Sequence, residues 1–395
     1  MIKMSKKGFT LIELLAVIVV LAIIALIATP IVLNIIKDSK DSATLRSAEN
    51  YMDAVVNAIA TTNMKEEGGL SITTCTIEES ILNCPVHGVI DVDINKEKPV
   101  SGTIVFNRGK VEDVNLIYSN GKTIVNDEKG NLEYLPEAVS FGTDSWNVIK
   151  ANVNTGVYNV GDEREIELDV DGDGTNTSYT LRIANLPSEE EIEEGCGTEG
   201  FSETACGFVV EFKDIISQYN MNPVGTYNGT SYPSGTNLGG WPASEMRKYI
   251  GGYKDTNGDI INGTIYKLLP NDLKKVLKDT YVVSGRGPDD KGTRVDENFE
   301  STDKLYLLTS REVYGNESTS DTTANSNVTR QLDYYKGKGV TIDSYSEVIK
   351  PYDGNDIFWW LRSASSDNAN SFFIETMSYY TASSPGGVSP AFRIG

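Results

Sequence analysis

The chain begins with a long apolar stretch. Nearly every side chain over residues 9–33 is apolar, and Lys3, Lys6 and Lys7 precede the stretch. A helix needs about 20 apolar residues to cross a bilayer, and lysines before such a helix keep the N-terminus in the cytoplasm. The pattern therefore predicts a transmembrane or assembly helix over residues 9–36. A secretory signal fits poorly, because the small residue Gly8 precedes the apolar run instead of following it.

One charge interrupts this stretch. Glu13 is the only charged residue between Phe9 and Ile36. A lone charge at membrane depth costs at least about 2.5 kcal/mol, so such a residue usually has a partner and a function. Pro30 lacks a backbone N–H and predicts a kink or local melting near residues 26–30. A plain membrane anchor, in which Glu13 has no function, is the alternative interpretation.

The helical pattern continues beyond the apolar stretch. Apolar residues recur three and four positions apart at Leu45, Ala48, Met52, Val55 and Ile59, which marks one face of an amphipathic helix. We expect this helix to end at Gly68-Gly69, after roughly 80 Å at 1.5 Å per residue. A helix of this length needs packing partners, so we expect other chains to cover its first half and its own domain to cover its second.

Short apolar segments separated by turns follow the helix. Strands are expected over residues 90–94, 102–106, 111–118 and 123–125. A helix on a small antiparallel sheet is a stable two-layer arrangement. We therefore expect a head domain over residues 37–138 and a linker over residues 139–156.

The rest of the chain, residues 157–395, is expected to form one mixed domain. Its pattern predicts helices over residues 241–250 and 265–277, and strands over residues 357–363, 372–377 and 388–394. The expected fold class is therefore α+β. It consists of a long N-terminal transmembrane or assembly helix packed on a small antiparallel sheet, followed by a mixed α+β domain.

Charge and cysteine content narrow the choice of partners and compartment. The formal net charge is −21, which argues against nucleic acid as a partner, because an acidic chain repels the phosphate backbone. The four cysteines form two close pairs, Cys75/Cys84 and Cys196/Cys206. On the outward side of a membrane this spacing favours two local disulfides, although four cysteines permit three pairings.

The chain contains a single histidine, His87. Any Ser-His-Asp or Cys-His arrangement would have to use it, so we expect no enzyme activity. Cys75, Cys84 and His87 are an alternative zinc site, but a structural zinc site normally has four ligands.

The residues Lys6-Lys7-Gly8-Phe9-Thr-Leu-Ile-Glu13-Leu-Leu resemble the processing site of type IV prepilins and pseudopilins. The resemblance implies that a membrane prepilin peptidase and methylase cuts after Gly8 and N-methylates Phe9. It further implies that Glu13 pairs with the N-terminal amine of a neighbouring subunit, and Pro30 matches the family's helix proline. The charges agree with this, because cleavage removes the three lysines and creates a positive amine that can neutralise a carboxylate in a low-dielectric bundle.

A second resemblance lies in the C-terminal domain. It rests on residues 302–315 and on Gly240-Trp-Pro-Ala-Ser-Glu-Met-Arg, Trp359-Trp-Leu-Arg-Ser and Gly387-Val-Ser-Pro-Ala-Phe-Arg-Ile. These segments resemble an uncharacterised bacterial surface domain that is itself similar to C-type lectin-like and formylglycine-generating-enzyme folds. The resemblance implies a C-type-lectin-like binding module over residues 157–395 and no established activity.

An acidic loop is a candidate metal site. Asp169, Asp171 and Asp173 precede Gly174 in a D-x-D-x-D-G pattern, so three carboxylates on alternate residues can converge on calcium. Thr180 stands where a calcium loop has a bidentate glutamate, and a simple acidic hairpin turn is the alternative. Calcium is the only cofactor we expect.

An aromatic cluster is a candidate ligand site. Trp359, Trp360 and Arg362 lie in one expected strand, and alternation places the two tryptophans on opposite faces. One interpretation puts both in the core, and the other lets one contact a sugar or protein ligand.

These features imply a type IV pilin-like structural subunit, a minor or tip pilin that displays an adhesion module. Its precursor would lie in the cell membrane with a cytoplasmic N-terminus, and the processed chain would enter an extracellular pilus. Expected partners are other pilin subunits in a homo- or hetero-filament, the peptidase, the membrane, and an extracellular glycan or protein. The alternatives are a pseudopilin of a type II secretion or DNA-uptake machine, and a pilin-anchored surface enzyme.

Overall fold

The computed structural model describes residues 11–63, 73–85, 88–107, 110–127, 129–223, 225–290, 298–315, 320–322 and 327–395. The chain divides into two compact units, residues 1–136 and 137–395. The expected helix end at Gly68-Gly69 and the single histidine His87 lie outside the described residues.

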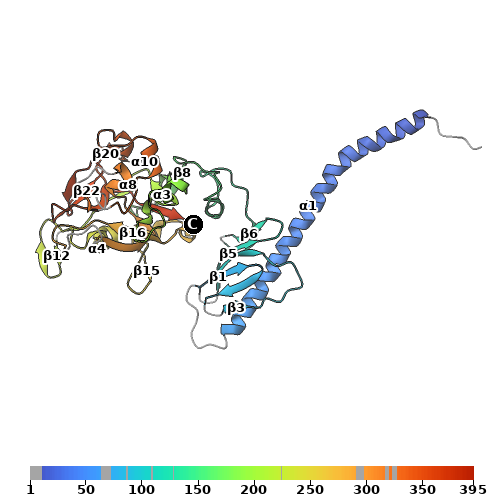
Figure 1. The fold of residues 1–395 in the computed structure, drawn as a ribbon, viewed down its shortest axis with the longest axis horizontal. Helices are drawn as coiled ribbons and strands as arrows, with labels where there is room; N and C mark the ends of the chain where they lie inside the picture. Colours follow the sequence, from blue (N-terminus) through green and yellow to red (C-terminus); the bar gives the residue numbers. More distant parts are fainter. Residues whose placement is uncertain are drawn as a thin grey trace, which may run out of the picture. The chain divides into compact units, whose positions relative to one another are not determined.

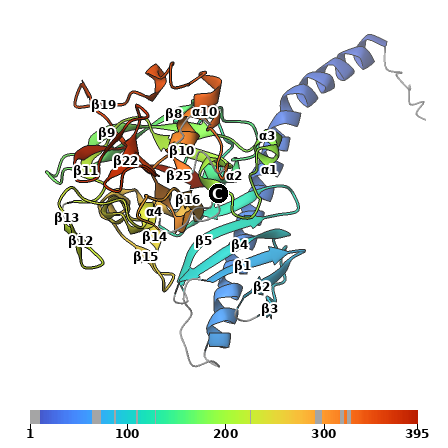
Figure 2. The same cartoon turned by 60° about the vertical axis from the view of Figure 1, so that its left-hand side comes forward.

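The first unit combines one helix with one sheet (Figure 1). Helix α1 spans Leu11–Asn63 and contains 53 residues. The antiparallel sheet has the strand order β3-β2-β1-β4-β5-β6-β7. Its strands are β1 (Thr73–Glu78), β2 (Ile81–Cys84), β3 (Gly88–Ile90), β4 (Ser101–Asn107), β5 (Lys110–Ile117), β6 (Thr123–Asn126) and β7 (Leu132–Tyr134). Figure 2 shows the C-terminal half of α1 lying across this sheet.

The amphipathic stripe of α1 packs on the sheet, as its spacing predicts. Ala48, Met52, Val55 and Ile59 are buried against strand residues such as Ile104. Polar contacts hold the same face: Lys122 Nζ lies 2.9 Å from Asp41 Oδ2, and the Tyr134 hydroxyl donates to the Asp41 carbonyl at 2.5 Å. By contrast, apolar side chains nearer the start of α1 are half or more exposed, including Leu14, Leu15 and Ile18.

The second unit is built from several small sheets. A five-stranded sheet has the order β18-β25-β10-β9-β8, a four-stranded sheet the order β15-β14-β17-β16, and a three-stranded sheet the order β21-β22-β23; β11-β24, β12-β13 and β19-β20 form two-stranded pairs. The strands are β8 (Glu163–Leu168), β9 (Thr177–Asn185), β10 (Phe208–Phe212), β11 (Ser217–Asn220), β12 (Gly225–Tyr227), β13 (Thr230–Tyr232), β14 (Tyr253–Lys254), β15 (Ile260–Ile261), β16 (Thr280–Ser284), β17 (Phe299–Asp303), β18 (Leu305–Tyr306), β19 (Pro351–Tyr352), β20 (Asn355–Asp356), β21 (Trp360–Ala364), β22 (Ser371–Ile374), β23 (Tyr379–Thr381), β24 (Pro385–Val388) and β25 (Ala391–Ile394).

The helices among the described residues of the second unit are short. They are α2 (Trp146–Ala151), α3 (Glu189–Glu193), α4 (Gly240–Ala243), α5 (Glu245–Ile250), α6 (Thr264–Leu268), α7 (Asn271–Val276), α8 (Ser310–Tyr314) and α10 (Asp333–Gly337), with 3-10 turns η1 (Glu203–Ala205) and η3 (Ser346–Val348). They pack around one core that includes Trp241, Trp359 and Trp360.

The expected α+β class is wrong, because the described chain is mostly β-sheet with few helices. The helix expected over residues 241–250 is divided at Ser244, which is extended (φ −69°, ψ 146°) and caps α5 by accepting a hydrogen bond from Arg247 N. The helix expected over residues 265–277 is divided at Pro270, which is also extended (φ −53°, ψ 143°). Short apolar runs suit strands and short helices equally, and these two breaks leave helices of four to six residues.

The transmembrane helix expected over residues 9–36 finds no support in the described residues. Within the part of the chain that the structure describes, no helix is both long and apolar enough to span a membrane. Local melting near residues 26–30 does not occur, because α1 stays helical through these positions. The helix is nevertheless bent along its length (Figure 1).

The segment expected as a linker, residues 139–156, is a packed part of the second unit. It contains α2, which Ser145 caps by accepting a hydrogen bond from Val148 N. Phe141, Trp146 and Ile149 are buried in the core of this unit. These large apolar side chains bury their surface against the sheet, which a solvated linker would not do.

Candidate functional site

The processing segment precedes the helix. Gly8 and Phe9 lie outside the described residues, and α1 begins at Leu11. Glu13 and Pro30 both lie on α1. The two residues expected to act in assembly therefore belong to the same helix that carries the exposed apolar side chains.

The acidic loop between β8 and β9 brings its three carboxylates together. Oxygen atoms of Asp169, Asp171 and Asp173 lie within 4.8 Å of one another. The carboxylates also accept backbone hydrogen bonds inside the loop, including Gly174 N to Asp169 Oδ2 at 3.1 Å. Thr180 is engaged elsewhere, since its N–H donates to Asp214 Oδ2 at 2.7 Å. The loop thus offers three carboxylates to a cation such as calcium, and it is also stable as an acidic turn.

The aromatic cluster is part of the core, so its interpretation as a ligand surface is corrected. Trp359, Trp360 and Arg362 are all fully buried. The indole nitrogens donate inward, Trp359 Nε1 to the Val348 carbonyl at 2.9 Å and Trp360 Nε1 to the Tyr219 carbonyl at 3.0 Å. A buried indole N–H needs such a partner, and none of the three side chains faces solvent.

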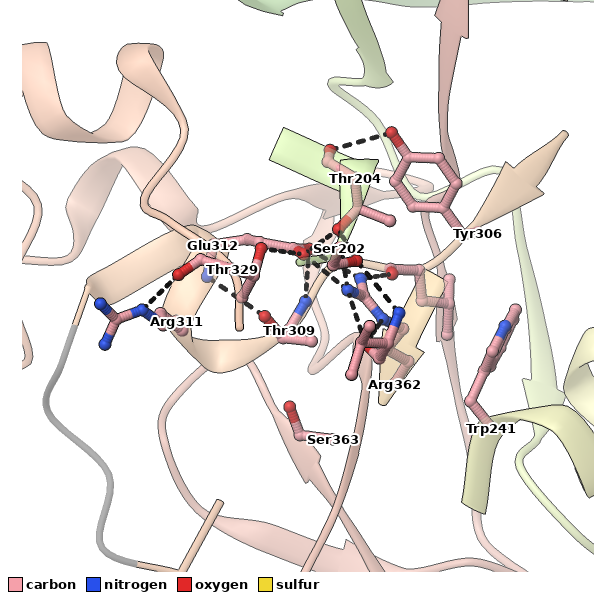
Figure 3. A network of polar contacts seen from close by, with 12 residues as sticks. Ser202, Thr204, Trp241, Tyr306, Thr309, Arg311, Glu312, Thr329, Arg362 and Ser363 are labelled. Atoms are coloured by element: carbon pink, nitrogen blue, oxygen red, sulfur yellow. Dashed lines mark hydrogen bonds and ion pairs between the residues drawn. The ribbon is translucent and has the colours of Figure 1, made fainter. Parts of the chain in front are cut away.

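Arg362 is the centre of a buried polar network (Figure 3). Its Nη2 donates to Glu312 Oε1 at 2.5 Å and to Thr204 Oγ1 at 2.9 Å. Its Nη1 donates to Glu312 Oε2 at 2.7 Å and to the Leu307 carbonyl at 2.6 Å. Glu312 also completes a capping box with Thr309 at the start of α8. The network joins β21, α8 and η1, and its polar groups form hydrogen bonds and ion pairs with one another.

A second buried network centres on Glu211 of β10. Its carboxylate contacts Arg182 Nη2 at 2.6 Å and Lys350 Nζ at 2.8 Å, and the Tyr335 hydroxyl donates to it at 2.7 Å. Burial alone would raise the pKa of Glu211, but the positive charges of Lys350 and Arg182 outweigh it and lower the pKa to about 2. These charges stabilise one another across the core.

Both cysteine pairs form local disulfides, Cys75–Cys84 and Cys196–Cys206. The first bond occupies both thiols of the alternative zinc site, so no thiolate remains there to bind a metal. The second bond closes the loop that carries Thr204, a partner of Arg362.

A comparison with protein families decides the class of the N-terminal segment. Residues 3–29 match the prokaryotic N-terminal methylation motif. This match supports a type IV pilin-like or pseudopilin-like precursor, which associates with other pilin subunits and with the prepilin peptidase. The motif implies a precursor anchored in a membrane and then assembled into a pilus.

The C-terminal part matches a different family. Residues 209–395 match a domain of unknown function (DUF6273). This agrees with the expected uncharacterised domain and does not confirm its lectin-like resemblance. No curated protein and no solved structure matches the chain.

The structure also contains a pocket that the sequence interpretation missed. Hairpin β12–β13 and helix α5 line a cavity of about 430 Å³. The signal in the sequence is Asn228-Gly229, a dipeptide typical of tight hairpins, with Tyr227 and Tyr232 on either side. Aromatic residues beside a tight turn could have indicated an exposed aromatic surface.

Proposed function

We propose that the chain is a minor or tip pilin of a type IV pilus, which polymerises through its N-terminal helix and displays residues 137–395 as a binding module for adhesion. The proposal rests on the methylation motif. This motif spans residues 3–29 and therefore includes the start of α1 at Leu11. In this proposal the peptidase cuts after Gly8 and methylates the new terminus at Phe9.

The exposed apolar side chains of α1 supply the driving force for assembly. Leu14, Leu15 and Ile18 are 60, 52 and 54% exposed. Between helices that leave a bilayer, this association comes from close van der Waals packing of the apolar side chains. Glu13 then sets the register, because a helix placed out of register would leave its carboxylate without the partner amine of Phe9.

The second unit suits a display role. Residues 137–395 form a compact unit with its own core and its own disulfide. The buried ion pairs at Arg362 and Glu211 are engaged within the core, which supports a binding module in preference to an enzyme.

The test combines mass spectrometry with electron microscopy of cells that express the chain together with its peptidase. We expect the mature protein to begin with N-methylated Phe9, and antibodies against residues 137–395 to label surface filaments sparsely or at their tips. An intact Met1 terminus in cells with an active peptidase would contradict the pilin role. Methylated protein confined to the cell envelope would instead favour the pseudopilin.

A further inference from the structure

The cavity at hairpin β12–β13 has the size of a small-molecule site. Its volume of about 430 Å³ lies in the range of roughly 300–1,000 Å³ typical of ligand pockets. It is open to solvent, and its lining mixes tyrosine rings with amide, hydroxyl, carboxylate and ammonium groups. It is separate from the buried networks around Arg362 and Glu211.

The hairpin presents two tyrosines to one side. Gly225 pairs with Tyr232 and Tyr227 pairs with Thr230, so the side chains of Tyr227, Thr230 and Tyr232 share the face of the hairpin on which Gly225 lies. The tight turn at Asn228-Gly229, with φ values of 47° and 80°, fixes this register. Tyr227 and Tyr232 are half-buried and both line the cavity.

The remaining walls are held by hydrogen bonds. Asn222 Oδ1 accepts a hydrogen bond from Glu245 N at 2.9 Å, and its amide nitrogen donates to the Thr236 carbonyl. Thr236 Oγ1 in turn accepts from Leu238 N at 3.1 Å. These bonds place the start of α5 against the floor of the cavity, so the walls are ordered before any ligand arrives.

The charges of the cavity point to a neutral ligand. Glu245 and Lys248 of α5 form an ion pair with an Nζ–Oε1 distance of 2.6 Å, so the lining carries one positive and one paired negative group. An anion would approach the Glu245 carboxylate, and a purely apolar ligand would remove both charges from water without offering them hydrogen bonds. A molecule with many hydroxyls and an apolar face meets neither penalty.

We propose that this cavity binds a residue of a neutral saccharide. The C–H face of the sugar ring packs on Tyr227 and Tyr232, and its hydroxyls bond to Glu245, Lys248 and Asn228. The inference deepens the proposed function and rests on it, because it names the class of ligand that the displayed module binds.

A stacked pair of tyrosines, on strand β11 and helix α5 and outside the lining of the cavity, offers a contact for a longer saccharide. Tyr249 lies one helical turn after Glu245, so the two side chains share a face of α5. Its ring stacks on Tyr219 with 4.0 Å between the ring centroids and 5° between the planes, and both residues are half-buried. We therefore expect oligosaccharides to bind more tightly than single sugars.

The experiment measures binding of neutral oligosaccharides of glucose, galactose, mannose and N-acetylglucosamine to the full mature chain in detergent, by calorimetry and saturation-transfer NMR. We expect at least one series to bind, with affinity increasing with chain length. Tyr232→Ala should weaken binding about tenfold, since an aromatic contact is worth about 0.5–1.5 kcal/mol, and Tyr232→Phe should keep most of it.

A blocking variant keeps the test independent of folding. Gly225→Trp points its side chain to the tyrosine face, and a Cβ there would meet only the Pro223 carbonyl oxygen at 4.0 Å, so it should fill the cavity without strain and abolish binding. Gly337→Trp on α10 is the matched control, because a Cβ there meets nothing within 4 Å and the position is exposed and outside the cavity. Its affinity should equal that of the wild-type chain.

The proposal is overturned if no saccharide of the panel binds, if only charged saccharides or peptides bind, or if Gly225→Trp binds as well as Gly337→Trp. Filament assembly separates this outcome from a failure of the proposed function. Filaments without saccharide binding would remove only the ligand class, whereas saccharide binding by a chain absent from filaments would remove the display role.

Discussion

Arg362 Nη2 lies 2.5 Å from Glu312 Oε1, and both side chains are fully buried. The pair joins strand β21 to helix α8 in the core of the second unit (Figure 3). Breaking a buried pair leaves an uncompensated charge away from water, which is far more costly than replacing both partners by apolar residues. Removing one partner of this pair should therefore destabilise the second unit, because the other charge would stay buried without a counter-charge.

The first prediction is that Glu312→Gln lowers the free energy of unfolding of the second unit by about 3–5 kcal/mol. Denaturant unfolding followed by tryptophan fluorescence measures it, since the core of this unit contains several buried tryptophans. Lys248→Ala breaks an exposed pair with Glu245 and is the control, with a loss of at most about 1 kcal/mol. Equal losses in the two variants would show that Glu312 adds nothing beyond a surface contact.

A second prediction concerns the Cys196–Cys206 disulfide. Replacing both cysteines by alanine should destabilise the second unit by about 3 kcal/mol in the chain-entropy description, for a sequence separation of 10 residues. The loop also positions Thr204 against Arg362, so the loss should not fall below this value. A reductant should destabilise the wild-type second unit and leave the unfolding of that unit in the variant unchanged; an effect in both would assign the change to another cause.

Sequence patterns recovered the local features of this chain and missed those set by distant contacts. The stripe at Ala48, Met52 and Val55 follows from helical spacing alone, and the disulfides follow from the proximity of the cysteines. The sequence left open whether Trp360 is buried, because its partner, the carbonyl of Tyr219, lies 141 residues away. Pairing across such distances decides which face of a strand is covered, and local alternation does not carry that information.

The errors in helix length and in the linker have different causes. Ser244 and Pro270 interrupt the two expected helices; serine is only a weak penalty within a helix, whereas proline costs about 3 kcal/mol there and was already a break signal in the sequence. Phe141 and Trp146 were predicted to lie in a linker because polar residues surround them. Both are instead buried in the core of the second unit. The ring centroid of Phe141 lies 6.2 Å from that of Phe208 on β10. The candidate processing residues could be recognised from the sequence because their motif is contiguous. The cavity beside Tyr227 and Tyr232 could not, because it forms only when the hairpin folds.

The third prediction is that Glu13→Ala abolishes filament assembly and leaves membrane insertion of the precursor intact. The substitution removes the carboxylate that is proposed to pair with the methylated amine of Phe9, and it makes the helix more apolar. Sheared-filament yield and membrane fractionation are the two measurements. Glu49→Ala changes an exposed carboxylate on the same helix and should assemble normally; normal filaments from Glu13→Ala would remove the proposed role of Glu13.

A fourth prediction is that calcium binds the acidic loop. Three carboxylates within 4.8 Å of one another repel each other, and a hard cation with oxygen ligands relieves this repulsion. Calorimetric titration should show one binding event that Asp171→Asn weakens at least tenfold. Asp255→Asn, in another acidic turn, should leave the titration unchanged, and a chain that shows neither heat nor a rise in melting temperature with calcium carries only a turn here.

The fifth prediction is a decline in stability between mildly acidic and neutral pH that depends on Glu375. Burial raises the pKa of this carboxyl from its ordinary value of 4.5 to about 7. Its Oε2 accepts a hydrogen bond from Trp359 N at 2.7 Å, and the Tyr314 hydroxyl donates to its backbone carbonyl. Because the folded state holds the proton more tightly than the unfolded state, its contribution is fully present below pH 4.5 and is lost as the pH rises to about 7.

Glu375→Gln keeps the shape and an acceptor for Trp359 N but cannot ionise. Its free energy of unfolding should therefore exceed that of the wild-type chain by about 3 kcal/mol above pH 8 and match it near pH 4, since each unit of pKa shift corresponds to about 1.36 kcal/mol. Urea unfolding at a series of pH values measures the free energy of unfolding of both chains. Groups that both chains share, such as Glu211, titrate equally in the two, so their contribution drops out of the difference. A difference that does not change with pH would mean that Glu375 ionises as freely in the folded protein as in the unfolded chain.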